Sequence, residues 1–217
     1  MLNNKVIWSI KSECGPSRDK NEDSVYPHSS GKSILPFKAG VFDGMGGHRS
    51  GEIASKIASK TMNKNFDSLD LYVTEANKEI FNHQNSNPET YCMGTTMTVI
   101  EITEDLLLKI AHVGDSRCYV FSDNKLFLLT EDDNLPENKN ILTQALGTKE
   151  ILNIQTRDYR LKKYDTIFLC TDGVCNEISD EYIKNKLGEG ISADTLISEI
   201  LIQEPKDNLS AIIINVM

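Results

Sequence analysis

The order of apolar segments along the chain predicts an α+β fold in which packed, mainly antiparallel sheets are covered by helices. Segments of strand length come first, two helical patterns follow, and then come many strands, two more helices and one last strand. This order lacks the regular strand–helix alternation of a doubly wound parallel sheet. Two segments, 166–170 and 209–216, are apolar almost throughout, so both faces of each are expected to be buried. The length of 217 residues fits one domain over 1–217.

The individual elements follow from periodicity and turn residues. Alternation in 5–10 places Val6, Trp8 and Ile10 on one face of a strand. Apolar residues recur at helical spacing in 50–62, where Ser50 is expected as the N-cap. The expected strands are 5–10, 37–42, 95–102, 106–113, 117–121, 125–129, 166–170 and 209–216, and the expected helices are 50–62, 69–84, 179–187 and 192–203. The most polar stretch, 131–140, is expected to be a surface loop.

Composition and charge exclude several classes of protein. The net charge of −9 and the pI near 5.0 argue against nucleic acid or an anionic membrane surface as the main partner. Residues 1–10 lack the apolar core of a signal peptide, and no apolar run approaches the length of a membrane span. The five cysteines never form a C-x-x-C pair. We therefore expect a reduced, cytoplasmic protein without a cysteine zinc site.

Aspartates stand at the ends of four strongly apolar strands. Asp43-Gly44 follows 37–42, Asp115 follows 106–113, Asp172 follows 166–170, and Asp207 shortly precedes 209–216. Each alone is more often a turn residue than a ligand. If the strand ends meet at one rim of a sheet, however, the carboxylates would repel one another unless cations lay between them. Oxygen ligands select hard ions such as Mg²⁺ or Mn²⁺.

A charged segment near the N-terminus admits two interpretations. Arg18 precedes Glu22 by four residues, and Asp23 follows directly. The segment alone is most simply a solvated charge cluster before a strand. Together with the aspartates it also fits a phosphate site, since arginine offers a planar fork to phosphate oxygens and acids can orient metal-bound water.

Eight motifs occur in order along almost the whole chain: RDKNED at 18, VFDGMGGH at 41, GTTMTV at 94, HVGDSRCYVF at 112, LLTEDDN at 128, NILTQALG at 140, FLCTDGV at 168 and DNLSAIII at 207. With these motifs the sequence resembles the metal-dependent serine/threonine protein phosphatases of type 2C, and the DGMGGH form is similar to the bacterial branch. The resemblance implies a four-layer αββα sandwich, two antiparallel sheets flanked by helices, with a site for two Mn²⁺ or Mg²⁺ ions at one end.

The resemblance also implies roles for particular residues. Asp43 would bridge the two metal ions, and the carbonyl of Gly44 would bind one of them. Asp172 and Asp207 would hold the other ion. Asp115 is similar to a ligand of a third, weaker ion. Gly46 and Gly47 would let the chain turn away from the ions without crowding them.

Further residues would support catalysis in such a site. Arg18 would clamp the substrate phosphate, Glu22 would act through water, and Asp23 and Asn208 would support the ligands. A hydroxide bridging the two ions would hydrolyse phosphoserine and phosphothreonine without a phosphoenzyme. The implied partners are phosphorylated proteins, among them a cognate serine/threonine kinase or its substrates. We expect a monomer.

Three features depart from the family pattern. Met45 stands where many eukaryotic members have a histidine proposed as general acid, and a thioether has no proton to donate. Asn176 stands where some members have an aspartate that contributes to the third ion. Only 135–139 lies where most bacterial relatives have a helical flap, so the site should be open and its selectivity altered. Two other functions stay open: an inactive module that binds partner proteins, and a phosphoester hydrolase for small molecules.

Overall fold

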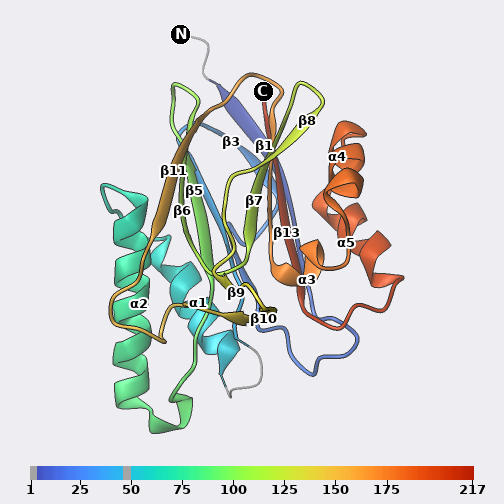
Figure 1. Cartoon of the computed structure of the whole chain (residues 1–217). Helices are drawn as coiled ribbons and strands as arrows, with labels where there is room; N and C mark the ends of the chain where they lie inside the picture. The colour runs from blue at the N-terminus through green and yellow to red at the C-terminus, as the bar shows by residue number, and fades with distance from the viewer. Residues whose placement is uncertain (1–3, 46–49) are drawn as a thin grey trace.

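Two antiparallel sheets packed face to face form the centre of the protein (Figure 1). The structure is a computed structural model that describes residues 4–45 and 50–217. One sheet has the strand order β3-β1-β13-β12-β7-β8. Its strands are β1 (Lys5–Glu13), β3 (Gly31–Ile34), β7 (Arg117–Ser122), β8 (Lys125–Leu128), β12 (Thr166–Cys170) and β13 (Leu209–Val216).

The second sheet has the order β11-β6-β5-β4-β2, and it too is antiparallel at each pairing. Its strands are β2 (Ser24–Tyr26), β4 (Phe37–Phe42), β5 (Met97–Ile102), β6 (Leu107–Val113) and β11 (Gln155–Arg160). A separate two-stranded pair joins β9 (Asn134–Leu135) to β10 (Asn138–Leu142).

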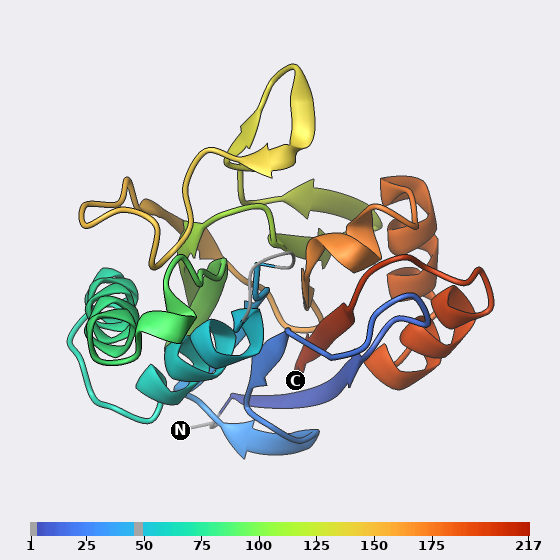
Figure 2. The same ribbon diagram turned by 90° about the horizontal axis from the view of Figure 1, so that it is seen from below.

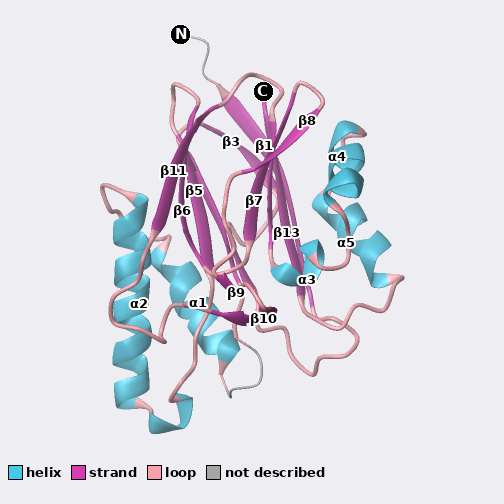
Figure 3. Ribbon diagram, in the orientation of Figure 1, coloured by secondary structure: helices cyan, strands magenta, loops and turns pink. Residues whose placement is uncertain are grey.

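Helices cover the outer face of each sheet (Figure 3). The helices α1 (Gly51–Thr61) and α2 (Leu69–Ser86) pack on the five-stranded sheet, while α4 (Asp180–Gly188) and α5 (Ala193–Leu201) pack on the six-stranded sheet. Short helical turns are α3 (Asp172–Cys175) and η1 (Pro88–Thr90). The predicted four-layer αββα sandwich is therefore confirmed.

Strand β13 shows why an almost unbroken apolar sequence suits this architecture. Ile212 and Ile214 belong to the apolar cluster between the two sheets, whereas Ala211 and Ile213 belong to the cluster beneath α4 and α5. Each of these side chains is at most 1% exposed. Because successive residues of a strand point to opposite faces, a strand covered on both sides favours apolar residues on both faces.

The predicted elements differ from the structure mainly where the sequence is polar. The expected loop at 131–140 is wrong in part, since its second half contributes to the β9–β10 pair. Strand β11 has the polar sequence QTRDYR because it is an edge strand whose side chains are mostly exposed. Ser50 is the N-cap residue of α1, as expected, but it has a φ of 98° and its side chain makes no capping hydrogen bond.

The sheet ends that carry the aspartates lie at one end of the sandwich, opposite the two chain termini (Figure 1). Figure 2 looks onto this end, where the β9–β10 hairpin (yellow) projects beyond the sheets. None of the helices in the described ranges is long and apolar enough to cross a membrane.

Candidate active site

One cleft of about 640 Å³ brings the strand-end aspartates together. Asp43 follows β4, Asp115 lies in the turn between β6 and β7, Asp172 begins α3 after β12, and Asp207 comes shortly before β13. All four line the cleft, as does Arg18. Side chains up to 189 positions apart in the chain thus share one concave site, as expected if the strand ends meet at one rim.

Asp43 lies at the centre of the acidic group. Its carboxyl group shares a hydrogen bond with that of Asp172. Burial raises the pKa of Asp43 well above its ordinary value, and the charges of Asp23, Asp172 and Asp115 raise it further. The Asp43 backbone is held by Thr96, because the Asp43 N–H donates to Thr96 Oγ1 at 3.0 Å and the Thr96 N–H donates to the Asp43 carbonyl at 2.8 Å.

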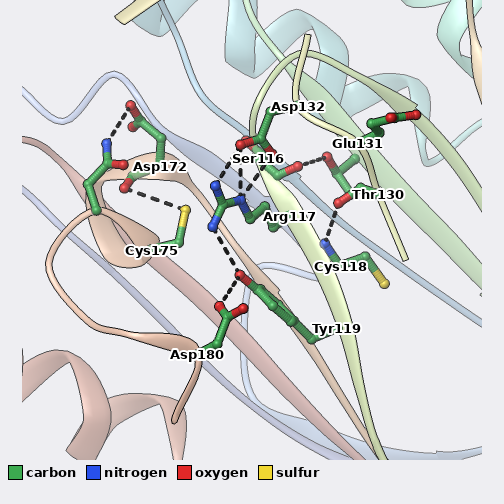
Figure 4. Close-up of polar contacts among 12 residues, drawn as sticks. Ser116, Arg117, Cys118, Tyr119, Thr130, Glu131, Asp132, Asp172, Cys175 and Asp180 are labelled. Carbon is green, nitrogen blue, oxygen red and sulfur yellow. Dashed lines mark hydrogen bonds and ion pairs between the residues drawn. The ribbon is translucent and has the colours of Figure 1, made fainter. Parts of the chain in front are cut away.

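Asp172 stands at the first position of α3 (Figure 4). Burial raises the pKa of Asp172, and the charge of Asp207 adds to this effect. The amide Nδ2 of Asn176 donates to Asp172 Oδ2 at 3.2 Å. The side chain of Asn176 thus stands beside the Asp172 carboxylate and joins it through its amide donor.

Asp207 forms an ion pair with Arg18. Arg18 Nη2 lies 2.8 Å from Asp207 Oδ2, and Arg18 Nε donates to the carbonyl of Lys206 at 3.2 Å. The two side chains of the pair are 35% and 40% exposed, so solvent partly screens their attraction. The guanidinium that was expected to clamp phosphate is thus inside the cleft and directed at its acidic floor.

Asp115 is only 9% exposed. Burial raises the pKa of Asp115 to about 7, with contributions from the charges of Asp172 and Asp132, while a hydrogen bond from Asn134 opposes the rise. Asp132 is itself held by Arg117, whose Nε and Nη2 donate to its two carboxylate oxygens at 3.0 and 2.6 Å (Figure 4). Strand β7 thereby fixes the segment that leads into the β9–β10 hairpin.

Three predicted site residues lie behind the cleft and do not line it. Asn208 Oδ1 accepts from the Glu22 N–H at 2.9 Å, and the Asn208 amide donates to the carbonyl of Lys20 at 2.9 Å. Asp23 Oδ2 accepts from Thr171 Oγ1 at 2.9 Å, and burial raises the pKa of Asp23 to about 7. Burial also raises the pKa of Glu22, and the charge of Glu52 raises it further. These residues secure the 18–23 segment against β12 and β13.

Gly44 permits a close approach of three backbone segments. A Cβ atom at this position would overlap the carbonyl oxygens of Glu22 and Gly51. The Gly44 N–H donates to the Glu22 carbonyl at 3.2 Å. A side chain is therefore excluded here for steric reasons. The predictions for Gly46 and Gly47 lie outside the described residues.

Several lining residues were not singled out from the sequence: Thr96, Ile141, Leu142, Gly173, Glu177 and Lys206. Thr96 lies within the GTTMTV motif, which was the one available signal for it. Ile141 and Leu142 reach the cleft only because 134–142 folds as a hairpin. Lys206 and Glu177 are single charged residues next to Asp207 and Asn176 in the sequence. Their neighbours are those of an ordinary polar turn, so the sequence offered no signal for them.

The donor set of the cleft suits hard cations. Within residues 4–45 and 50–217, no three His, Cys, Asp or Glu side chains stand as a ready-made cation cluster. Asp207 is paired with Arg18, and the carboxyl group of Asp43 is hydrogen-bonded to that of Asp172. Burial raises the pKa values of Asp43, Asp115 and Asp172, and the charges of neighbouring carboxylates raise them further. Divalent cations with oxygen preference would relieve this repulsion.

The family model for protein phosphatase 2C matches residues 17–199, so the chain belongs to the protein phosphatase 2C family. Among curated relatives, the serine/threonine phosphatase stp of Listeria welshimeri is 28% identical over 241 aligned positions that cover 94% of each chain. The serine/threonine protein phosphatase PstP of Mycobacterium tuberculosis is 30% identical, and the match covers 97% of this chain but 45% of that protein. The 241 aligned positions exceed the 217 residues of this chain, so the Listeria relative carries additional residues.

Solved structures of similar proteins share the fold. The crystal structure of the Mycobacterium tuberculosis phosphatase PstP/Ppp superimposes with a TM-score of 0.85 at 26% identity, covering 97% of this chain and 98% of that one. The catalytic domain of PstP in complex with two manganese ions gives a TM-score of 0.85 at 28% identity, with 99% of each chain covered.

Proposed function

We propose that the cleft hydrolyses phosphoserine and phosphothreonine in proteins, as a metal-dependent serine/threonine phosphatase. The observation that carries this proposal is the meeting of Asp43, Asp172 and Asp207 with Arg18 in one cleft. Membership of the protein phosphatase 2C family and the two manganese ions of the PstP catalytic domain support it. Phosphorylated proteins are accordingly the substrates.

Two Mn²⁺ or Mg²⁺ ions would be held by Asp43, the Gly44 carbonyl, Asp172 and Asp207, and a third, weaker ion by Asp115. When bound, the ions supply activation of water and neutralisation of phosphate charge. Asp207 would have to exchange its Arg18 partner for a cation, since the two are paired at 2.8 Å.

The residues of the chain have separate tasks in this proposal. Once released from Asp207, the guanidinium of Arg18 can present two parallel N–H groups to phosphate oxygens and stabilise the charge that develops on them. Glu22 acts through water, while Asp23 and Asn208 hold the 18–23 segment in place. Met45 lines the cleft without a proton to give, so it takes no part in protonating the leaving group.

The remaining proposals concern the domain organisation, oligomeric state, localisation and substrates of the protein. Because the site joins residues from 18 to 207, we propose that residues 1–217 act as one domain. We further propose a monomeric, cytoplasmic protein whose substrates include a cognate serine/threonine kinase or the proteins that this kinase phosphorylates. The short hairpin in place of a helical flap leaves the cleft open, so selectivity should differ from that of flap-bearing relatives.

The test is hydrolysis of p-nitrophenyl phosphate and of a phosphothreonine peptide with Mn²⁺, with and without chelator. The wild type should hydrolyse both, chelator should abolish the activity, and Asp207→Ala should lower kcat at least about 100-fold, as expected when a group that stabilises the transition state is lost. Asp158→Ala, a change on the exposed edge strand β11, is the matched control and should retain wild-type activity. Absence of activity under every metal condition would favour a binding module instead, and preference for nucleotides over the peptide would favour a small-molecule hydrolase.

A further inference from the structure

Two cationic side chains line the catalytic cleft in the described part of the chain, and they are used differently. Arg18 is paired with Asp207 and is half-buried. Lys206 is exposed, and no carboxylate of the described residues lies within ion-pair distance of its ammonium group. Arg18 is therefore neutralised by an acid of the cleft, whereas the ammonium group of Lys206 is available to a ligand.

The backbone of Lys206 is held in place. The preceding residue, Pro205, is buried. Arg18 Nε donates a hydrogen bond to the Lys206 carbonyl at 3.2 Å. On the other side, Asp207 Oδ1 accepts from the Asn208 N–H at 2.8 Å. The backbone of Lys206 is thus tied to Arg18, and its side chain lines the same cleft.

The relative exposure of the two cations separates their roles. Arg18 lies deeper, against Asp207, where the phosphate of a substrate would be bound. Lys206 lines the same cleft but is more exposed than Arg18, as expected for a side chain that meets the parts of a peptide next to the phosphorylated residue. The net charge of −9 disfavours acidic peptides in general, so attraction of an acidic group at this cleft depends on a local cation.

We propose that Lys206 is a specificity-determining residue that binds a carboxylate or second phosphate adjacent to the phosphorylated residue of the substrate. This inference rests on the proposed phosphatase function and names its substrate class: phosphosites in an acidic sequence context. A single partly exposed ion pair contributes up to about 1 kcal/mol, or about a fivefold change in binding.

The experiment compares two phosphothreonine peptides, one with glutamate and one with glutamine on both sides of the phosphothreonine. The wild type should show a lower KM for the glutamate peptide. Lys206→Ala should raise that KM about threefold to fivefold with kcat unchanged and should leave the glutamine peptide and p-nitrophenyl phosphate unaffected. Lys206→Arg should keep the preference, and Lys206→Glu should reverse it. Lys163→Ala, at an exposed lysine between β11 and β12, is the control that should behave as wild type.

Three results would overturn the inference. Equal KM values of the wild type for the two peptides would show that no acidic preference exists. An equal loss by Lys206→Ala on both peptides and on p-nitrophenyl phosphate would place Lys206 on the phosphate itself. Failure of the wild type to hydrolyse p-nitrophenyl phosphate with any metal would refute the proposed function and this inference with it, whereas hydrolysis without peptide discrimination would refute the inference alone.

Discussion

Asp115→Asn should make the metal-free protein more stable at alkaline pH. The Asp115 carboxyl is 9% exposed and lies near the charges of Asp172 and Asp132. An asparagine keeps nearly the same shape and an acceptor oxygen for the Asn134 contact, but it has no charge to bury. The substitution therefore removes an electrostatic cost and leaves the packing almost unchanged.

The magnitude follows from the pKa difference. Burial raises the pKa of Asp115 to about 7 from the ordinary value of 3.8. Because the folded state binds this proton more tightly than the unfolded state, the stability that the proton supplies is fully present below pH 4 and is lost as pH rises through 7. The difference of about three units corresponds to about 4 kcal/mol at pH 8, since each unit is worth about 1.4 kcal/mol.

The assay is urea unfolding in chelator between pH 4.5 and 8, followed by the fluorescence of the single tryptophan, Trp8. At pH 4.5 the free energies of unfolding of wild type and Asp115→Asn should agree within about 1 kcal/mol, and at pH 8 the variant should be more stable by up to about 4 kcal/mol. Asp158→Asn, an exposed carboxylate on β11, should follow the wild type at each pH. Parallel pH curves for wild type and Asp115→Asn would refute the reasoning.

Three further predictions concern the ions, the backbone and the support of the cleft. In thermal melts Mn²⁺ should raise the Tm of wild type and of the control Asp158→Asn. It should raise the Tm of Asp172→Asn much less, because a metal ligand is lost. Equal shifts in Tm for the three proteins would contradict the assigned site. Gly44→Ala should prevent stable folding, because the new Cβ would overlap backbone carbonyls. The control Gly190→Ala has open space around it but a φ of +76°, so in urea unfolding it should lower the free energy of unfolding by only about 1 kcal/mol. Arg117→Ala should lower the free energy of unfolding by about 2–4 kcal/mol, because it leaves a partly buried carboxylate unpaired; a loss below about 0.5 kcal/mol would show that this ion pair is not structural.

Much of the fold could be predicted because burial leaves a local signature. The predicted segments 166–170 and 209–216 coincide with β12 and β13, whose residues are covered on both faces. Strands β2, β3 and β11 were missed because short or edge strands bury too few side chains to impose a period of two. The β9–β10 pair was missed for the same reason, and with it the apolar wall that Ile141 and Leu142 give to the cleft.

The candidate site, too, was predictable from the sequence only in part. By itself, the sequence determined which aspartates end apolar strands and which motifs surround them, because strand ends and turns are encoded by neighbouring residues. Only the tertiary structure decided that Arg18 pairs with Asp207 and that Lys206 stays unpaired beside them. Those contacts depend on the order of strands in the sheets, which brings together residues 189 positions apart, and no local pattern in the chain specifies that order.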